Sequence, residues 1–198
     1  MRRILALLLT VVPALTLASL AACTDSVQAG FGPLASPARE GDLMTLQRML
    51  DAGADPNAVD PGGNHWTPLF HAIHKEQAGA VDLLLKAGAD PITSRSGLTP
   101  LLMAVGTGNA AIVRRLLRSG ADPHTDDRVL LTAVSGGALS DLDNPLLGRC
   151  NADVVRVLYE KAPDLRLEPG PRTRVALWFA WFNRCGDQLR AAGVKGAS

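Results

Sequence analysis

The sequence predicts an all-α protein built as a solenoid, a stack of repeated helix pairs. A unit of two large apolar residues, two variable residues and Gly-Ala-Asp-Pro recurs three times, with its glycines at Gly53, Gly88 and Gly120. A spacing in the low thirties between such copies is typical of stacked repeats. Apolar residues at helical spacing precede each glycine. Such a stack offers an extended binding surface rather than a closed catalytic pocket.

The first 22 residues predict a signal peptide that the mature protein lacks. Arg2 and Arg3 form a basic start, residues 4–20 are almost wholly apolar, and small residues precede Cys23. This order is typical of a secretory signal. Two alternatives remain open. One is an uncleaved membrane helix, because the apolar segment approaches the spanning length, and the other is a twin-arginine export signal.

The residues Leu20-Ala21-Ala22-Cys23 resemble the lipobox of bacterial lipoproteins. The resemblance implies that cleavage leaves Cys23 as a lipidated N-terminus, which anchors the protein to a membrane. It also implies the outer membrane, facing the periplasm, since Thr24 stands where an Asp would favour the inner membrane. Residues 23–32 then form a short tether before the folded domain, residues 33–194.

The first repeat departs from the pattern at its start. Pro37 would interrupt a helix that began near Pro33, so we expect Ser36 to cap a helix whose first residue is Pro37. Gly41 then separates this helix from a second one that carries Leu46. Terminal repeats are expected to be atypical, because they cover the stack against water.

The second repeat begins with Thr67-Pro68 and has Glu76 at the position between its two helices where the next copy has Gly108. The connector before it, residues 60–66, is longer than in the other copies. We expect this connector to form a β-turn finger that projects from the stack.

The third repeat carries the clearest helix signals. Thr99 is expected to cap a helix that begins at Pro100 and ends at Gly108. A second helix follows, and Gly120 is expected to terminate it in the left-handed conformation. Its expected core residues are Ile112, Val113, Leu116 and Leu117.

The last two repeats are degenerate. In the fourth, residues 129–134 and 152–161 predict the two helices, and residues 138–149 are an insertion between them. In the fifth, residues 175–180 and 188–193 predict shortened helices, followed by a tail at 195–198. About half of the aromatic cluster in this repeat is expected in the core and the rest in an exposed patch. The cluster comprises Trp178, Phe179, Trp181 and Phe182.

The segment Gly97-Leu98-Thr99-Pro100-Leu101 resembles the start of an ankyrin repeat, and the resemblance extends over about residues 33–194. It implies four to five ankyrin repeats with degenerate ends. It also implies a protein that binds another protein and that has neither catalytic activity nor a cofactor.

The resemblance further implies that partners contact the concave side, which finger tips and the exposed ends of the first helices form. In this sequence, the corresponding residues are Arg39, Glu40, Trp66, His74, Lys75, Arg95, Ser96, Leu98, Thr107, Asp126 and Asp127. Trp66 is the preferred anchor, because binding energy concentrates on buried Trp, Tyr and Arg. The alternative for Trp66 is packing beneath its own finger.

Composition argues against a nucleic-acid-binding protein. The chain has 20 Lys and Arg and 19 Asp and Glu, so loss of Arg2 and Arg3 with the signal peptide leaves a net charge of about −1. No basic footprint for nucleic acid remains. Arg114, Arg115 and Arg118 lie at helical spacing and are expected on a solvated helix face.

The remaining cysteines and the histidines do not predict a metal or catalytic site. We expect Cys150 and Cys185 to be bridged, as the periplasm permits; two buried thiols are the alternative. His71 and His74 share a helix but have no evident third ligand, so no metal is expected. By the repeat alignment, His71 should be buried and His74 exposed.

Together these features predict a monomeric, envelope-anchored lipoprotein that binds another protein non-covalently in the periplasm. Two specific roles remain open. One is an immunity protein that neutralises a periplasm-targeted effector such as a lipase. The other is a stress-protective envelope scaffold.

Overall fold

The computed structural model describes residues 32–61, 64–135, 151–182 and 185–194. The chain divides into two units, Met1–Gly30 and Phe31–Ser198, and every described residue belongs to the second. The predicted signal peptide, Cys23 with nearly all of its tether, the insertion, Cys150 and the tail lie outside the described residues. Among the helices that are described, none is both long and apolar enough to cross a membrane.

Helices form nearly all of the regular structure in these ranges. They are α1 Ala35–Glu40, α2 Leu43–Asp51, α3 Pro68–His74, α4 Ala78–Lys86, α5 Pro100–Thr107, α6 Ala110–Arg118, a 3-10 helix Pro123–Thr125, α7 Arg128–Ser135, α8 Ala152–Lys161, α9 Pro171–Phe182 and α10 Gly186–Ala191. The described residues contain no strand, only an isolated β-bridge between Arg95 and Leu98. The predicted all-α solenoid is therefore confirmed.

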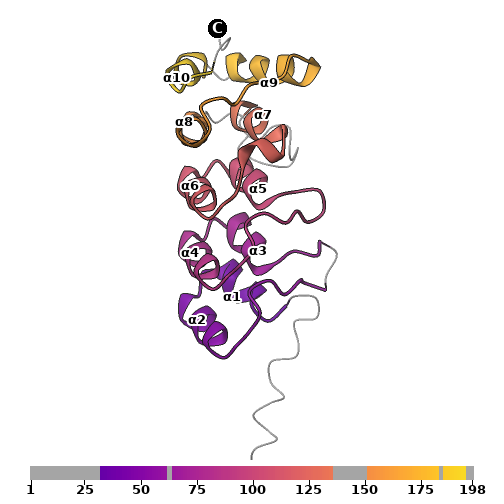
Figure 1. The fold of residues 1–198 in the computed structure, drawn as a ribbon, viewed down its shortest axis with the longest axis vertical. Coiled ribbons are helices and arrows are strands. Elements are labelled where there is room, and N and C mark those ends of the chain that lie inside the picture. The colour runs from indigo at the N-terminus through magenta and orange to yellow at the C-terminus, as the bar shows by residue number, and fades with distance from the viewer. Residues whose placement is uncertain (1–31, 62–63, 136–150, 183–184, 195–198) are drawn as a thin grey trace, which may run out of the picture. The chain divides into compact units, whose positions relative to one another are not determined.

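The described helices form five pairs that stack in succession (Figure 1). The first helices α1, α3, α5, α7 and α9 pack on one another in one column, and α2, α4, α6, α8 and α10 form the second. The loops that connect one pair to the next extend on the side of the first helices. We call these loops fingers: finger 2 is residues 55–67, finger 3 is residues 90–99 and finger 4 is residues 122–127.

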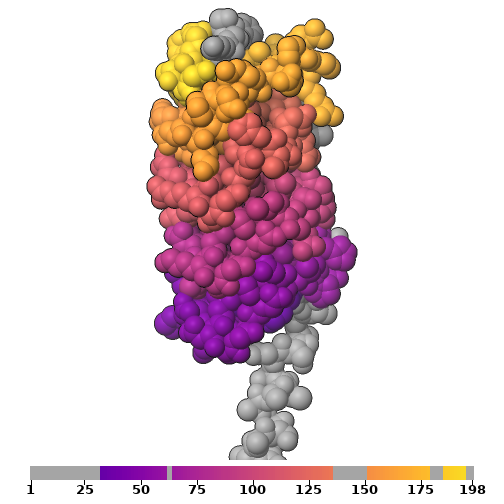
Figure 2. Space-filling model, in the orientation of Figure 1, coloured from indigo at the N-terminus to yellow at the C-terminus, as the bar shows by residue number. Residues whose placement is uncertain are grey.

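One hydrophobic core runs through all five pairs. Each second helix contributes a fully buried leucine, in the order Leu46, Leu84, Leu116, Leu158 and Leu189, although Leu46 lies about one helical turn earlier in its repeat than the other four. Burying one such side chain contributes roughly 1.5–3 kcal/mol. Successive repeats are accordingly in direct contact over the described part of the stack (Figure 2).

The third repeat begins and ends its helices as predicted. The Thr99 hydroxyl accepts a hydrogen bond from the Leu102 N–H at 3.0 Å, and Pro100 is the first helical residue. Gly108 ends α5 with φ at 76°, and Gly120 follows α6 with φ at 102°. Both glycines therefore adopt the left-handed conformation that a Cβ atom disfavours.

Three helices have bounds that differ clearly from the prediction. Helix α10 spans Gly186–Ala191 rather than 188–193. Leu34, not Ser36, is the residue before α1, and Pro37 is the third residue of the helix rather than its first. Pro37 fits there because the N–H groups of the first helical turn have no partner inside the helix. Helix α9 runs from Pro171 to Phe182 and is longer than the predicted 175–180, since Pro171 is a favourable first residue.

Candidate functional site

Finger 3 forms a tight turn that presents its tip away from the helices. Arg95 and Leu98 exchange backbone hydrogen bonds of 2.8 and 2.9 Å across the turn. The two residues between them have positive φ, 50° at Ser96 and 76° at Gly97. Positive φ at both central residues is the mark of a type I′ turn. This turn fixes the backbone from which Arg95 and Leu98 extend.

Hydrogen bonds tie neighbouring fingers together at their tips. The Ser96 hydroxyl donates to the Asn64 carbonyl at 2.8 Å, which links finger 3 to finger 2. The Arg128 guanidinium donates to the Gly97 carbonyl at 2.7 Å and to the Asp126 carboxylate at 2.7 Å, which links finger 3 to finger 4. A surface that is already ordered loses less conformational entropy when a partner binds.

The fingers are also linked at their bases. The Asn57 side chain donates to the Gly88 carbonyl at 3.0 Å and accepts from the Asp90 N–H at 2.8 Å. These two bonds join finger 2 to the start of finger 3. The sequence did not reveal this contact, because Asn57 lies between elements and belongs to no helical pattern.

Trp66 lies at the junction of finger 2 and α3, where it is partly buried. Its ring stacks on the buried Phe70 with a centroid distance of 6.2 Å and lies 5.4 Å from His71. It also lies 5.3 Å from the exposed His74. Trp66 thus packs on its own repeat and stays partly exposed, and its role as an anchor for a partner stays a prediction.

A buried pair, Asp60 and His71, lies next to Trp66. His71 and Asp60 are each 5% exposed, and Nε2 of His71 lies 3.2 Å from the Asp60 carboxylate. Burial lowers the pKa of His71, although the hydrogen bond with Asp60 opposes the shift. The Asp60 N–H donates to the Trp66 carbonyl at 2.8 Å, which closes the base of finger 2. His71 is buried and His74 exposed, as expected.

The predicted contact residues differ in their accessibility. The exposed ones are Arg39, Glu40, His74, Lys75, Ser96 and Asp127, and the partly buried ones are Trp66, Arg95, Leu98, Thr107 and Asp126. The side chain of Asp126 is only 8% exposed and is paired with Arg128, whose hydrogen bond lowers the pKa of Asp126. The Thr107 hydroxyl donates to the Ala104 carbonyl at 2.9 Å. Of the two predicted contact aspartates on finger 4, Asp127 is therefore the one exposed to solvent.

Positive charge gathers on the first three repeats of this surface. Arg39, Lys75 and Arg95 carry it, and Glu40 is the one acid among the predicted contact residues there. The next acid in that set presented to solvent is Asp127, on finger 4. Among the predicted contact residues, the cations thus lie on the first three repeats and the exposed aspartate lies on the fourth.

The arginines of α6 lie in the second column of helices, away from the fingers. Arg115 pairs with Asp82 of α4 at 2.6 Å, and Arg114 pairs with Glu160 of α8 at 3.3 Å. All four side chains are between 31 and 53% exposed. The predicted solvated face therefore also forms ion pairs between repeats, which the local spacing alone did not predict.

One of the two cysteines predicted to be bridged lies among the described residues, and so do His71 and His74. Among the described residues, no group of three or more His, Cys, Asp and Glu side chains could hold a metal ion. Cys185 is buried at 2% exposure just before α10. Cys150 lies outside the described residues, so the predicted bridge stays a prediction.

The aromatic cluster of the last repeat is also described only in part. Trp178 is 53% exposed on α9, while the side chains of Phe179, Trp181 and Phe182 lie outside the described part of the chain.

Comparison with known sequences identifies the repeats. Residues 34–127 match the family model described as ankyrin repeats, in three copies. The 2-5A-dependent ribonuclease of Mus musculus is 42% identical over 53 residues, which are 27% of this chain and 7% of the ribonuclease. The phosphate system positive regulatory protein PHO81 of Saccharomyces cerevisiae is 41% identical over 49 residues, which are 25% of this chain and 4% of that protein. The match therefore spans less than a tenth of either relative.

A solved structure agrees over a larger part of the chain. The crystal structure of the human ASB11 ankyrin repeat domain is similar with a TM-score of 0.64 and 23% sequence identity. The similarity covers 83% of this chain and 70% of that one. At this identity the likeness shows the fold, and the described stack is an ankyrin-repeat solenoid.

Proposed function

We propose that this protein is an envelope-anchored lipoprotein whose fingers and first helices bind another protein non-covalently. Ankyrin repeats generally mediate protein–protein binding, and the fold is an interaction scaffold rather than a typical catalytic one. The observation that carries the proposal is the row of hydrogen-bonded fingers. Ser96 and Arg128 connect three of them into one ordered surface with Trp66 at its start.

The finger surface has the composition of a recognition site. Trp and Arg are enriched among residues that dominate binding energy, and Trp66 and Arg95 lie on adjacent fingers. Each also has a buried nitrogen, Nε1 of Trp66 and Nε of Arg95, that finds no hydrogen-bond acceptor among the described residues. A buried donor without an acceptor costs about 1–3 kcal/mol. A partner that rearranges these side chains would relieve that cost.

The charges of the surface indicate the chemistry of the partner. Lys75 lies on the repeat that carries Trp66, and Arg39 and Arg95 lie on the two adjacent repeats, so an acidic segment with an apolar side chain would fit there. Exposed charges of this kind raise the rate of association more than the final affinity. We therefore expect binding to weaken as the salt concentration rises.

The anchoring part of the proposal is supported by the sequence before the described residues. The lipobox-like Leu20-Ala21-Ala22-Cys23 follows an apolar segment with a basic start. Thr24 at the next position favours the outer membrane, facing the periplasm. An immunity protein and a stress-protective scaffold both fit such a location, and the neighbouring genes would distinguish them, because an immunity gene lies beside that of its effector.

Two substitutions in the fingers test the binding surface. We expect Trp66→Ala and Arg95→Ala each to weaken capture of the partner from envelope extracts by about tenfold or more, since such anchors often contribute at least 1.4 kcal/mol. The bait is residues 24–198, and quantitative mass spectrometry measures the captured protein.

The matched controls are Arg114→Ala and Arg115→Ala in the second column of helices. They remove half-exposed ion pairs and should leave capture unchanged. Melting temperatures of all four variants separate lost binding from lost folding. The proposal fails if the α6 variants abolish capture while the finger variants retain it.

A further inference from the structure

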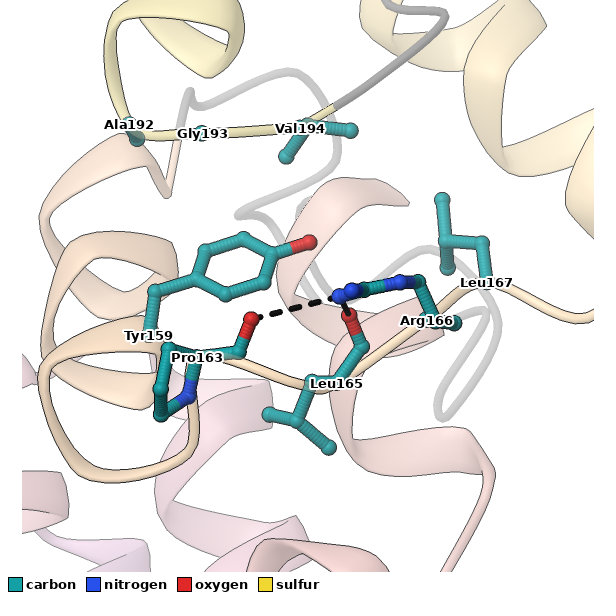
Figure 3. Close-up of a pocket in the computed structure, with 8 residues that line it drawn as sticks. All are labelled: Tyr159, Pro163, Leu165, Arg166, Leu167, Ala192, Gly193 and Val194. Carbon is teal, nitrogen blue, oxygen red and sulfur yellow. Dashed lines mark hydrogen bonds between the residues drawn. The ribbon is translucent and has the colours of Figure 1, made fainter.

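A cavity of about 350 Å³ lies between the last two described repeats, away from the fingers of the first three. Its walls come from α8, from residues 163–167 after it, and from residues 192–194 after α10 (Figure 3). This volume falls within the range of small-molecule sites. The cavity is independent of the proposed protein-binding surface.

Arg166 is held in place at one side of this cavity. Its Nη1 donates to the Pro163 carbonyl at 3.2 Å and to the Leu165 carbonyl at 2.9 Å (Figure 3). Both acceptors belong to the loop that carries Arg166, so the guanidinium is fixed relative to its own backbone. The two bonds involve only one of its three nitrogens. A guanidinium oriented in this way matches the two oxygens of a carboxylate.

Tyr159 adds a second donor next to Arg166. In Figure 3 its ring extends from α8 into the cavity, and its hydroxyl points toward the guanidinium. Burial raises the pKa of Tyr159, and the charge of Arg166 opposes that shift. The hydroxyl is therefore protonated at neutral pH and can donate a hydrogen bond.

The rest of the wall is mainly apolar. Leu165 and Val194 are buried at 7% and 3% exposure, and Leu167 is partly buried. Among the described residues, no acidic side chain lines the cavity; the neighbouring Asp164 lies 3.2 Å from His124 instead. The described wall thus combines one cation, one hydroxyl donor and apolar side chains.

We propose that this cavity binds a small monocarboxylate with an apolar body, such as a medium-chain fatty acid. The carboxylate lies between the Arg166 guanidinium and the Tyr159 hydroxyl, and the apolar body covers Leu165, Leu167 and Val194. A single guanidinium balances one negative charge, which favours a carboxylate over a doubly charged phosphate ester. Gly193 has φ at 104°, a conformation that a Cβ atom disfavours, so the backbone beside the Tyr159 ring favours glycine.

Octanoate is a suitable probe, and Tyr159 is a suitable reporter because it is the only tyrosine in the sequence. The test uses the compact unit, residues 31–198, which contains the whole described core. Isothermal titration calorimetry measures the affinity, and the ring signals of tyrosine-labelled protein locate the site by NMR. We expect saturable binding with a shift of the Tyr159 signals.

Variants separate the charge from the apolar wall. Arg166→Gln should weaken octanoate binding at least tenfold, as expected for loss of a charged hydrogen bond, and Tyr159→Phe should weaken it severalfold. Arg156→Gln is the matched control. Arg156 lies on α8, as Tyr159 does, but it pairs with Asp153 and does not line the cavity. It should bind octanoate like the wild type.

Octanol and phosphate complete the test on unmodified protein, so that the outcome does not depend on the folding of a variant. Octanol should bind at least tenfold more weakly than octanoate, and inorganic phosphate should leave the Tyr159 signals unmoved. Equal binding of octanol and octanoate would overturn the role of Arg166. Absence of any saturable shift with octanoate would overturn the site itself.

Discussion

At the residue scale, buried polar pairs decide where the exposed side chains of finger 2 lie. The Asp60 carboxylate pairs with His71, which packs against the Trp66 ring, and the Asp60 backbone N–H donates to the Trp66 carbonyl. One buried residue thus helps to hold both the loop and the aromatic ring. Because burial lowers the pKa of His71, the neutral imidazole is the donor at neutral pH. The burial of His71 was predictable from its place in the repeat. Its pairing with Asp60 was not, because a loop aspartate follows no apolar period.

His124 offers a test of residue-scale electrostatics. Its Nδ1 lies 2.9 Å from Asp122 and its Nε2 lies 3.2 Å from Asp164, which joins finger 4 to the fourth repeat's end. The hydrogen bond with Asp122, helped by the charge of Asp164, raises the pKa of His124 above 6.5. A histidine whose pKa is higher in the folded than in the unfolded protein stabilises the fold when it is protonated. This stabilisation is complete at pH values below the pKa of the unfolded state and is lost as the pH rises through the pKa of the folded state.

We therefore expect His124→Gln to lower the melting temperature more at about pH 5.5 than at about pH 8.5. Thermal denaturation followed by circular dichroism at both pH values measures the difference. Asp164→Asn in the His124→Gln background is the control and should have no pH-dependent effect of its own. If His124→Gln lowered the melting temperature equally at both pH values, the positive charge of His124 would not stabilise the fold.

At the scale of the element, helix ends were predictable where the signal is local. Thr99, Pro100 and Gly108 set the bounds of α5, because a cap, a first-turn proline and a left-handed glycine act within a few residues. After α3, Glu76 occupies the position that corresponds to Gly108 and has φ at 55°, although it lacks the conformational freedom of glycine. Its carboxylate accepts a hydrogen bond from the Asn109 side chain at 3.0 Å. The start of α1 was mispredicted, since Pro37 is tolerated anywhere in the first turn.

The two threonine positions before α3 and α5 allow a matched test of capping. Thr99 accepts from the Leu102 N–H, whereas Thr67 makes no side-chain cap bond. We expect Thr99→Val to lower the free energy of unfolding by about 1 kcal/mol. Thr67→Val makes the same change of side chain and should alter the free energy of unfolding by less than about 0.5 kcal/mol. Urea denaturation measures both; a larger cost at Thr67 would contradict the assigned cap.

At the scale of the whole molecule, the period of the glycines predicted the stack, and a fully buried leucine from each second helix helps to fill its core. The finger contacts were less predictable. Ser96 was a candidate for partner binding, and its hydroxyl donates to the Asn64 carbonyl. Asp126 was another candidate, and its carboxylate is committed to Arg128. The Ser96 bond joins residues 32 positions apart, and Arg128 also donates to Gly97, 31 positions away. Such partners depend on how the repeats stack, which a local pattern does not encode.

The predicted anchor has its own test at this scale. Cys23→Ser removes the thiol that lipidation requires, so we expect a longer, unprocessed precursor in place of the mature form. Immunoblotting of cell fractions and intact-mass measurement detect the change. The conservative Thr24→Ser variant is the control and should be processed normally. Normal processing and membrane retention of Cys23→Ser would exclude lipidation at this residue.

The most direct measurement of the finger surface as a binding site is photocrosslinking in living cells. A photoreactive amino acid replaces Lys75, exposed at the end of α3, or Arg118, exposed on α6 in the second column. If the fingers and first helices bind the partner, irradiation joins a discrete protein to the variant at 75 and none to the variant at 118. A crosslink from 118 together with none from 75 would place the partner on the opposite side and contradict the proposed surface.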